Sequence, residues 1–364
     1  MFNIWTTTQA GHNLLPLLRD TAHAAAMTLT DWDDTLRLAR QARLLGLLGH
    51  RLCEQKDIWA QIPPPVQGHL TSAINYSAHR KQMVLMELDT INKAIPKDIP
   101  VILLKGAAYI AQGAEYAQGR IPNDVDLLVT RTDLDRTEAI LNAAGWVSDT
   151  QDAYDQHYYR EWSHELPPMR LPGHALEVDL HHTITPVTSR VRADDSILFS
   201  GLQTIPRSRF LCLHPLDQII HASIHLFQDS ELSGRLRDFV DIDGMIRLSV
   251  RSTTNWEQLL LRAEAHGASR YLWYTLHYCH FWLDTPVPEN LALPPPPAVA
   301  RGLMDSILTH GCLPSLTDRN TGFRKRIAEQ FGRLRYHWLR MPPGLLVRHA
   351  SHKILLELIK RQGA

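Results

Sequence analysis

The chain has 364 residues, of which 44% are hydrophobic and 21% are charged, as is typical of a folded globular protein. This composition excludes a disordered chain and a collagen-like chain. Lys and Arg together number 38, as do Asp and Glu, so the formal net charge is zero. The whole molecule is therefore not a polycation built to coat nucleic acid. The length predicts two or three domains, or one core with large additions.

The cysteines and the apolar segments predict a cytoplasmic protein. The four cysteines are too far apart for a zinc ribbon or a CxxC redox motif, so we expect reduced thiols: Cys53, Cys212, Cys279 and Cys312. The first 15 residues lack a basic stretch followed by an apolar run, so we expect no signal peptide. No stretch of about 18 apolar residues occurs, and we expect no membrane-spanning helix.

Residues 13–96 carry a helical pattern. Apolar residues recur at spacings of three and four from Asp31 to Lys56, which predicts a helix capped by Thr30 or Asp31. Three prolines at 63–65 interrupt the chain, and a second long helix is expected over residues 66–95.

The pattern changes after Pro96 to alternating strands and helices. The run Ile99–Leu104 is continuously apolar, as in a buried strand. The elements expected after it are a helix from Ala107 to Gln112, a strand over Asp124–Val129, a helix over Thr132–Ala144 that begins at a Thr132 cap and stops at Gly145, and strands over Gln156–Trp162 and Ala175–His181.

The remainder of the chain reverts to helical periodicity. We expect helices over residues 215–229, 235–249, 255–266, 268–283, 298–310, 322–340 and 344–361. Six prolines between Pro286 and Pro297 predict a stiff connector. These changes of pattern predict four regions, over residues 1–96, 97–200, 201–290 and 291–364.

Two pairs of carboxylates are the strongest indication of chemistry. Asp124 and Asp126 are two residues apart on a predicted strand, so both side chains point to the same face. Glu177 and Asp179 repeat this spacing on another predicted strand. If the two strands are neighbours, three carboxylates can hold two divalent metal ions about 3.5–4 Å apart, the arrangement used for in-line phosphoryl displacement.

A strand that ends in Lys105-Gly106 and leads into a helix is typical of a phosphate-binding turn. Backbone N–H groups at the helix N-terminus are free to bind an anion, and Gly106 lets the ligand approach the backbone closely. Lys105 and Arg120 could neutralise phosphate charge. A single Asp-x-Asp or Lys-Gly pair is weak evidence, but their order along one strand–helix–strand unit is more specific.

These residues resemble the nucleotidyltransferase superfamily of the polymerase-β type. Within it, the chain is similar to a group of uncharacterised bacterial nucleotidyltransferases with an LKG…R…DxDLLV…E/DLH pattern, here between residues 101 and 182. The resemblance implies a small mixed-sheet core. Together with the helical patterns before and after residues 97–200, it leads us to expect an α+β fold in which N-terminal and C-terminal helical regions flank that core. It also implies Mg²⁺, with Mn²⁺ as an alternative, and transfer of a nucleoside monophosphate from an NTP with release of pyrophosphate.

By position, the resemblance implies that Asp124 and Asp126 bind metal, with Asp179 as the third carboxylate and Glu177 as the other candidate. It further implies that Gly106 opens the phosphate-binding helix. The superfamily usually has Gly-Gly or Gly-Ser at this turn, whereas Ala107 follows Gly106 here, so no hydroxyl can bind a phosphate at that position. Lys105, Gly106, Ala107 and Arg120 are the predicted nucleotide-binding residues.

Several other side chains have two interpretations each. His181 or His182 could orient a metal-binding carboxylate or be satisfied by the backbone. His221 and His225 are four residues apart, a spacing that suits zinc or helix packing. Asp238 could be a general base or a salt-bridge partner. The aromatic run from Tyr271 to Trp282 could form core or a platform for a base.

The segment from Arg324 to Arg361 has ten Lys or Arg and two Asp or Glu, a net charge of +8. It could be a solvated helix face, contact a membrane surface, or dock RNA or an acidic protein partner. The main hypothesis is nucleotidyl transfer to an unidentified acceptor, which could be a small molecule, peptide, protein or RNA. The alternative is a catalytically degenerate nucleotide-binding module or a protein- or RNA-interaction module.

Overall fold

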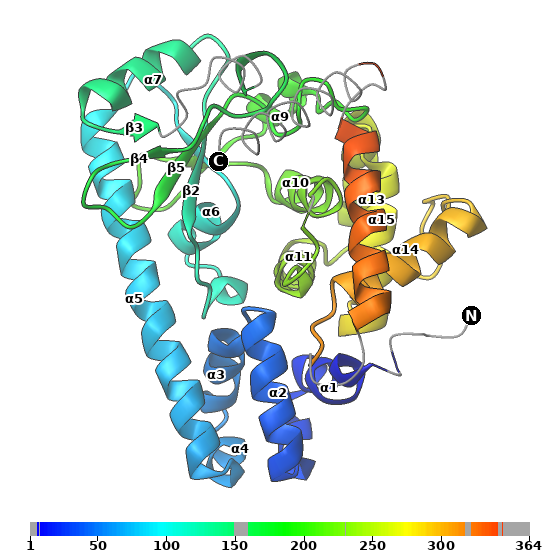
Figure 1. Ribbon diagram of the computed structural model, residues 1–364. Helices are drawn as coiled ribbons and strands as arrows, with labels where there is room; N and C mark the ends of the chain where they lie inside the picture. The colour runs from blue at the N-terminus through cyan, green and yellow to red at the C-terminus, as the bar shows by residue number, and fades with distance from the viewer. Residues whose placement is uncertain are drawn as a thin grey trace, which may run out of the picture.

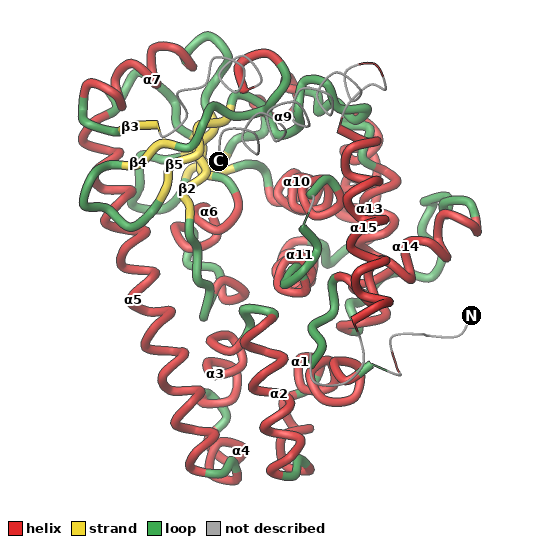
Figure 2. Tube along the Cα trace, viewed as in Figure 1, coloured by secondary structure: helices red, strands yellow, loops and turns green. Residues whose placement is uncertain are grey.

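A computed structural model describes residues 6, 8–148, 159–229, 231–316, 322–340 and 344. It is an α+β fold in which helices at both ends of the chain flank one mixed sheet, as predicted (Figures 1 and 2). In Figure 1 the long helix α5 (Pro64–Ala94) runs the length of the molecule, from the N-terminal helices to the sheet.

The N-terminal region consists of short helices packed beside α5. They are α1 (Leu15–Arg19), α2 (Leu29–Gln41), α3 (Leu45–Cys53) and α4 (Lys56–Gln61). The prediction of one helix over Asp31–Lys56 is wrong, because the chain turns between α2 and α3, where Arg43 has a φ of 56°. The predicted cap, Thr30 or Asp31, was also wrong by two or three residues, because Thr28 is the N-cap. The Thr28 hydroxyl accepts a hydrogen bond from the Asp31 N–H, and the Asp31 carboxylate accepts one from the Thr28 N–H.

Seven strands form one sheet in the order β3-β4-β5-β2-β1-β7-β6. They are β1 (Ile102–Leu103), β2 (Asp124–Leu128), β3 (Val147–Ser148), β4 (Met169–Arg170), β5 (Glu177–His181), β6 (Gln203–Thr204) and β7 (Leu211–Cys212). The pairs β2–β5 and β1–β7 are parallel and the others antiparallel, which makes the sheet mixed. β2 lies beside β5, the condition on which the three-carboxylate site depended.

The strand predicted over Gln156–Trp162 is wrong in the part of it that the structure describes. Within Gln156–Trp162, residues 159–161 are helical, and residues 156–158 lie outside the described part of the chain. Conversely, four strands that the sequence did not predict have only two residues each: β3, β4, β6 and β7. Two residues are too few to show a period of two, so pairing with neighbours defines these strands.

The helices after the sheet lie within two residues of their predicted bounds. They are α10 (Pro215–Phe227), α11 (Leu236–Ser249), α12 (Thr253–Ala265), α13 (Ser269–Leu283), α14 (Ala298–Gly311) and α15 (Gly322–Arg340). Within the α/β block lie α6 (Lys105–Ala111), α7 (Leu134–Ala143) and the short α9 (Asp195–Ser200). The predicted helix 344–361 falls outside the described residues except for residue 344.

The aromatic run on α13 belongs to the core. Tyr274 and Trp282 are buried, and the rings of Phe227 on α10 and Phe239 on α11 pack against them. The centroids of Phe239 and Trp282 are 5.0 Å apart in an edge-to-face contact. The structure therefore favours the core interpretation of this helix. α13 holds α10 and α11 in place, and these two helices face the sheet across the site described below (Figure 1).

α15 packs on α14 and is basic and amphipathic. Its buried side includes Ala328, and Arg335 donates a hydrogen bond to the carbonyl of Phe227. Along its other side runs a stripe of exposed apolar residues: Phe323, Ile327, Phe331, Leu334 and Trp338. An acidic or anionic partner for this region stays a prediction. Among the described residues, the helices are too short or too polar to cross a membrane.

Candidate functional site

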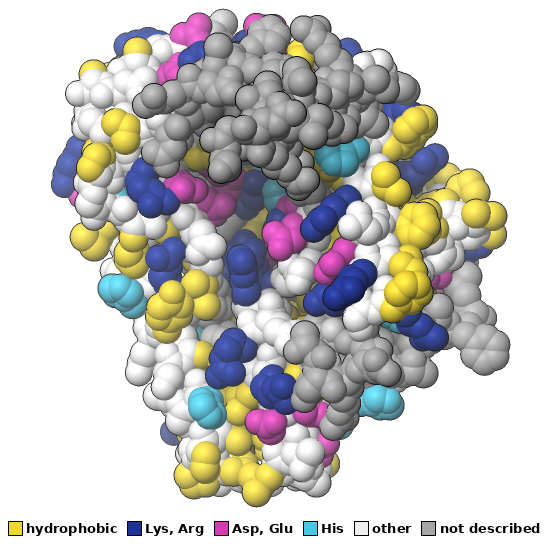
Figure 3. All heavy atoms as spheres, in the orientation of Figure 1, with side chains coloured by type: hydrophobic (Ala, Val, Ile, Leu, Met, Phe, Trp, Pro, Cys, Tyr) yellow, Lys and Arg dark blue, Asp and Glu magenta, His cyan; other side chains and the backbone are white. Residues whose placement is uncertain are grey.

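A cavity of about 290 Å³ lies between the sheet and the helix pair α10–α11. β2, β5 and α6 line one side of it, and α10, α11 and the loop before β2 line the other. Figure 3 shows acidic and basic side chains gathered across the middle of this face of the molecule. The cavity brings together six of the eight predicted site residues: Lys105, Gly106, Arg120, Asp124, Asp126 and Asp179.

The strand register sets the positions of the carboxylates. β2 and β5 run parallel with Asp126 opposite Asp179 and Asp124 opposite Glu177. Because side chains two residues apart share a face, the alternating positions of both strands point to the cavity side. Asp124, Asp126 and Asp179 line the cavity, and Asp126 is only 3% exposed.

Glu177 and Ala107 do not reach the cavity. The Glu177 side chain is 42% exposed and forms an ion pair with Arg170 of β4, which lies on the far side of β5 from β2. Of the two candidates for a third carboxylate, Asp179 is therefore the one that lies beside Asp124 and Asp126. Ala107 is buried in the hydrophobic core, so it cannot contact a ligand through its side chain.

The pKa values of the three carboxyl groups are shifted in different directions because their surroundings differ. Burial would raise the pKa of Asp126, but the Lys105 ammonium and a hydrogen bond from His181 hold that pKa well below its usual range. Burial, together with Asp126, Glu165 and Asp124, raises the pKa of Asp179 well above its usual value. Burial and the charge of Asp126 also raise the pKa of Asp124. Repulsion among the carboxylates is therefore not cancelled by the protein's own cations.

The turn between β1 and α6 brings Lys105 to the carboxylates. Lys105 has a φ of 44°, in the left-handed region, and its Nζ lies 2.7 Å from Asp126 Oδ1. The Leu104 N–H donates to the Asp126 carbonyl oxygen at 3.0 Å, which fixes the turn to β2. Gly106 follows, and a Cβ there would lie 3.2 Å from the Arg120 Nε. A glycine at this position leaves room for the Arg120 guanidinium.

Arg120 is held on the opposite side of the cavity. Its guanidinium forms an ion pair with Asp241 of α11 and lies over the Tyr109 ring, 5.4 Å from the centroid. Burial and the neighbouring Arg237 lower its pKa to about 10. At neutral pH it is still charged, and it stands close to both Gly106 and α11.

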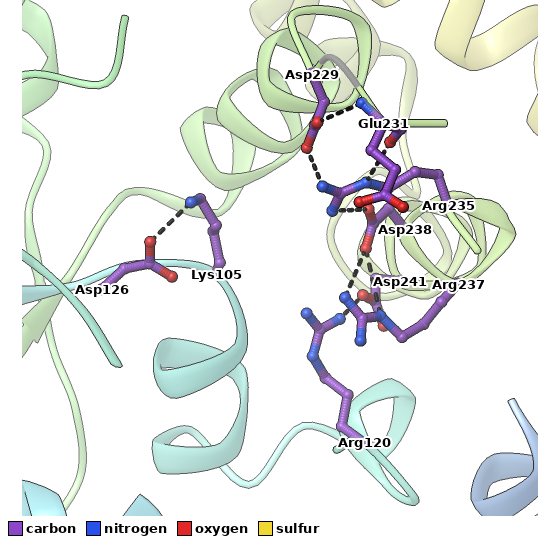
Figure 4. A network of polar contacts seen from close by, with 9 residues as sticks. All are labelled: Lys105, Arg120, Asp126, Asp229, Glu231, Arg235, Arg237, Asp238 and Asp241. Atoms are coloured by element: carbon purple, nitrogen blue, oxygen red, sulfur yellow. Dashed lines mark hydrogen bonds and ion pairs between the residues drawn. The ribbon is translucent and has the colours of Figure 1, made fainter. Parts of the chain in front are cut away.

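A network of ion pairs joins the start of α11 to Arg120 (Figure 4). Asp238 contacts Arg235 at 3.1 Å and Arg237 at 3.3 Å, and Arg235 also pairs with Asp229 at the end of α10. Burial would raise the pKa of Asp238, but the arginines hold it far below its usual value. Such a carboxylate is a poor base, so the structure favours the salt-bridge interpretation of Asp238.

Histidines also lie in and near the cavity. His181 Nε2 lies 3.0 Å from Asp126 Oδ1, so His181 is the histidine that contacts a predicted metal-binding carboxylate. His221 and His225 are packed edge to face, with ring centroids 6.4 Å apart. Burial lowers the pKa of His221 to about 3, so it is neutral. A packing role accounts for this pair.

The cavity-lining residues that sequence reasoning missed include His164, Glu165 and Asp241. His164 and Glu165 lie in a segment without periodicity, and backbone pairing with β5, including the bridge between Glu165 and His181, places them. Asp241 had a weak signal, because it lies one helical turn after Asp238 on the same face of α11.

The cavity is acidic overall. Seven carboxylates and four basic side chains of the described residues line it, which gives a formal charge of −3 with every carboxylate ionised and histidines neutral. Lys105 and the three arginines already have carboxylate partners. The cavity therefore does not attract a polyanion unless cations accompany it.

The chain belongs to a protein family described as uncharacterised nucleotidyltransferases, whose model matches residues 28–284. This match covers more than half of the chain and confirms the resemblance drawn from residues 101–182. It begins just before α2, so it includes α2 to α5 but not α1, and it reaches the end of α13. No curated protein and no solved structure matches the chain. The family supports a general role in nucleotidyl transfer.

Proposed function

We propose that this protein transfers a nucleoside monophosphate from an NTP to an acceptor hydroxyl and depends on Mg²⁺ for the reaction. The observation that carries the proposal is the convergence of Asp124, Asp126 and Asp179 from two parallel strands in one cavity. In this reaction the acceptor oxygen bonds to the α-phosphorus, the bond from that phosphorus to the pyrophosphate oxygen breaks, and the hydroxyl proton is released.

The three carboxylates fit a hard divalent cation. Asp179 Oδ1 is buried and, among the described residues, has no hydrogen-bond partner, while burial and the neighbouring carboxylates raise the pKa of Asp179. Oxygen donors of this kind suit Mg²⁺ or Mn²⁺. A bound cation would offset the negative charge of the carboxylates and of the triphosphate.

Lys105, Gly106 and Arg120 would bind and orient the triphosphate. The Lys105 ammonium lies at the carboxylates, and the Arg120 guanidinium lies against Gly106. Their ion pairs with Asp126 and Asp241 hold both cations in position before a ligand arrives, so the two side chains lose little conformational freedom when it binds. Catalysis in this proposal is positioning together with electrostatic stabilisation.

Thermal unfolding with each of the four NTPs, with and without Mg²⁺, tests this function. Wild type should be stabilised by at least one NTP only when Mg²⁺ is present, by about 2.7 kcal/mol at 100 times Kd. Asp124→Asn and Asp126→Asn should lose this stabilisation, whereas Asp98→Asn, an exposed aspartate on the surface, should keep it.

An assay of pyrophosphate release with candidate acceptors completes the test. Release that both Asp124→Asn and Asp126→Asn abolish is the expected result. Binding of Mg²⁺–NTP without release by any acceptor would favour the nucleotide-binding module without catalysis. Stabilisation by NTP that needs no divalent cation would contradict the proposal.

A further inference from the structure

We propose that His164, Glu165 and His181 form a second metal site, which takes a transition-metal ion and adjoins the three carboxylates. One ligand atom from each of these residues lies within 4.8 Å of the others. The proposal goes beyond nucleotidyl transfer, because it concerns an ion of a different chemical class and can be tested without any nucleotide.

The three side chains converge on one point. Glu165 Oε2 lies 3.4 Å from His181 Nε2 and 3.5 Å from His164 Nε2. The two imidazole rings are tilted towards each other with centroids 5.1 Å apart. A metal ion bound by nitrogen and oxygen at about 2.0–2.2 Å needs ligand atoms at separations of this size.

Strand pairing holds the ligands, although His164 and Glu165 lie outside any named strand. The His182 N–H donates to the His164 carbonyl at 3.0 Å, and the Leu166 N–H donates to the Leu180 carbonyl at 2.8 Å. Glu165 forms an antiparallel bridge with His181. The short segment is therefore fixed along β5 on both sides of the cluster.

Burial keeps the cluster largely from solvent. The His181 side chain is fully buried, and His164 and Glu165 are 13% and 24% exposed. The side chains are thus shielded, while one side of the cluster still opens to the cavity. An ion could enter from there without unfolding β5.

The donor atoms define the class of ion. Two imidazoles and one carboxylate favour ions such as Zn²⁺, Fe²⁺ or Co²⁺, whereas an oxygen-only set favours Mg²⁺. The two donor sets touch, because His181 Nε2 lies 3.0 Å from Asp126 Oδ1. Asp126 also has the Lys105 Nζ at 2.7 Å, so its carboxylate keeps a cationic partner when His181 binds an ion.

Co²⁺ is the probe for the test, because its visible absorption reports nitrogen ligands. The full chain without a histidine tag, stripped with a chelator, should bind one Co²⁺ with visible absorption bands of imidazole coordination. His164→Gln and Glu165→Gln should each weaken binding about tenfold or more and shift the bands. His225→Gln, which removes a cavity histidine outside the cluster, should change neither.

The outcomes separate this site from the proposed reaction. Unchanged Co²⁺ affinity and spectrum in both His164→Gln and Glu165→Gln would overturn the metal site. Circular dichroism and thermal unfolding of each variant establish whether it is folded. If His164→Gln does not fold, Glu165→Gln, at the more exposed position, carries the test alone. Stabilisation by Mg²⁺–NTP, measured in the same variants and in Asp124→Asn, reports separately on the proposed function.

Discussion

At the scale of single residues, Asp126 and Asp179 show how one pair of facing carboxylates acquires two different states. They are opposite each other on parallel strands, yet Lys105 and His181 surround only Asp126. Lys105 and His181 therefore lower the pKa of Asp126 against the effect of burial, whereas burial and the nearby carboxylates raise that of Asp179. Single side chains also decide which of Asp179 and Glu177 is the third carboxylate of the cavity.

Replacing each candidate for the third carboxylate tests that distinction. Asp179→Asn should reduce transfer by roughly 100-fold or more, since it removes charge from the cavity, and should leave the melting temperature unchanged or higher because repulsion is relieved. Glu177→Gln, the matched control, should change the rate by less than about threefold. A larger loss in Glu177→Gln than in Asp179→Asn would move the assignment to Glu177.

At the scale of elements, a contact between two glycines joins the N-terminal helices to the site. Gly46 on α3 lies against Gly119, which precedes Arg120. A Cβ on Gly119 would lie 2.1 Å from the Leu47 backbone N, and one on Gly46 would lie 2.7 Å from the Gly119 carbonyl oxygen. The position of Arg120 therefore depends on α3, although α3 contributes no side chain to the cavity.

Two glycine substitutions separate the steric effect from the backbone effect. Gly119 and Gly113 have almost the same φ, 71° and 68°, but a Cβ on Gly113 meets open space. Gly113→Ala should cost about 1–2 kcal/mol, the penalty of a left-handed conformation. Gly119→Ala should cost at least about 2 kcal/mol more, measured by denaturant unfolding, and should weaken NTP binding. Equal losses in the two variants would show that the contact with α3 is unimportant.

At the scale of the whole molecule, one hydrophobic cluster extends from Ala10 to Leu316 and crosses the predicted region boundaries. A few buried ion pairs link its helices. Among them, Asp217 of α10 is fully buried and accepts hydrogen bonds from the Arg262 Nε at 2.8 Å and from its terminal nitrogen at 2.6 Å. Burial would raise the pKa of Asp217, but these bonds and His266 lower it.

The dependence of stability on pH follows from this pair. Because the pKa of Asp217 is lower in the folded protein than the usual 3.8, the stabilisation is complete above about pH 4 and is lost as the pH falls further. Arg262→Gln removes the guanidinium from this buried carboxylate, which should cost about 3–5 kcal/mol at pH 7. Denaturant unfolding between pH 7 and pH 3 should show the difference from wild type shrinking in acid, and a constant difference would refute this account.

Parts of this structure were accessible from the sequence because they follow local rules. The apolar run before Lys105 and the alternation in Asp124–Leu128 predicted β1 and β2, and the repeated two-residue spacing gave Glu177 and Asp179 as candidates for the third carboxylate. The choice between Asp179 and Glu177 was not accessible, since both share one face of β5 and only Arg170 on the neighbouring strand separates them. The turn at Arg43 has no glycine or proline to announce it, and Glu165 enters the cavity through tertiary contacts alone.

The parallel register of β2 and β5 also restricts how the length of this protein can change over evolution. Side chains alternate between the two faces of a strand, so deleting one residue early in β5 would exchange the faces of everything after it. Val178 and Leu180 would then enter the polar cavity, and Asp179 and His181 would enter the core. A lineage can substitute residues in these strands one at a time, but a one-residue gain or loss inside either would remove the whole cluster at once.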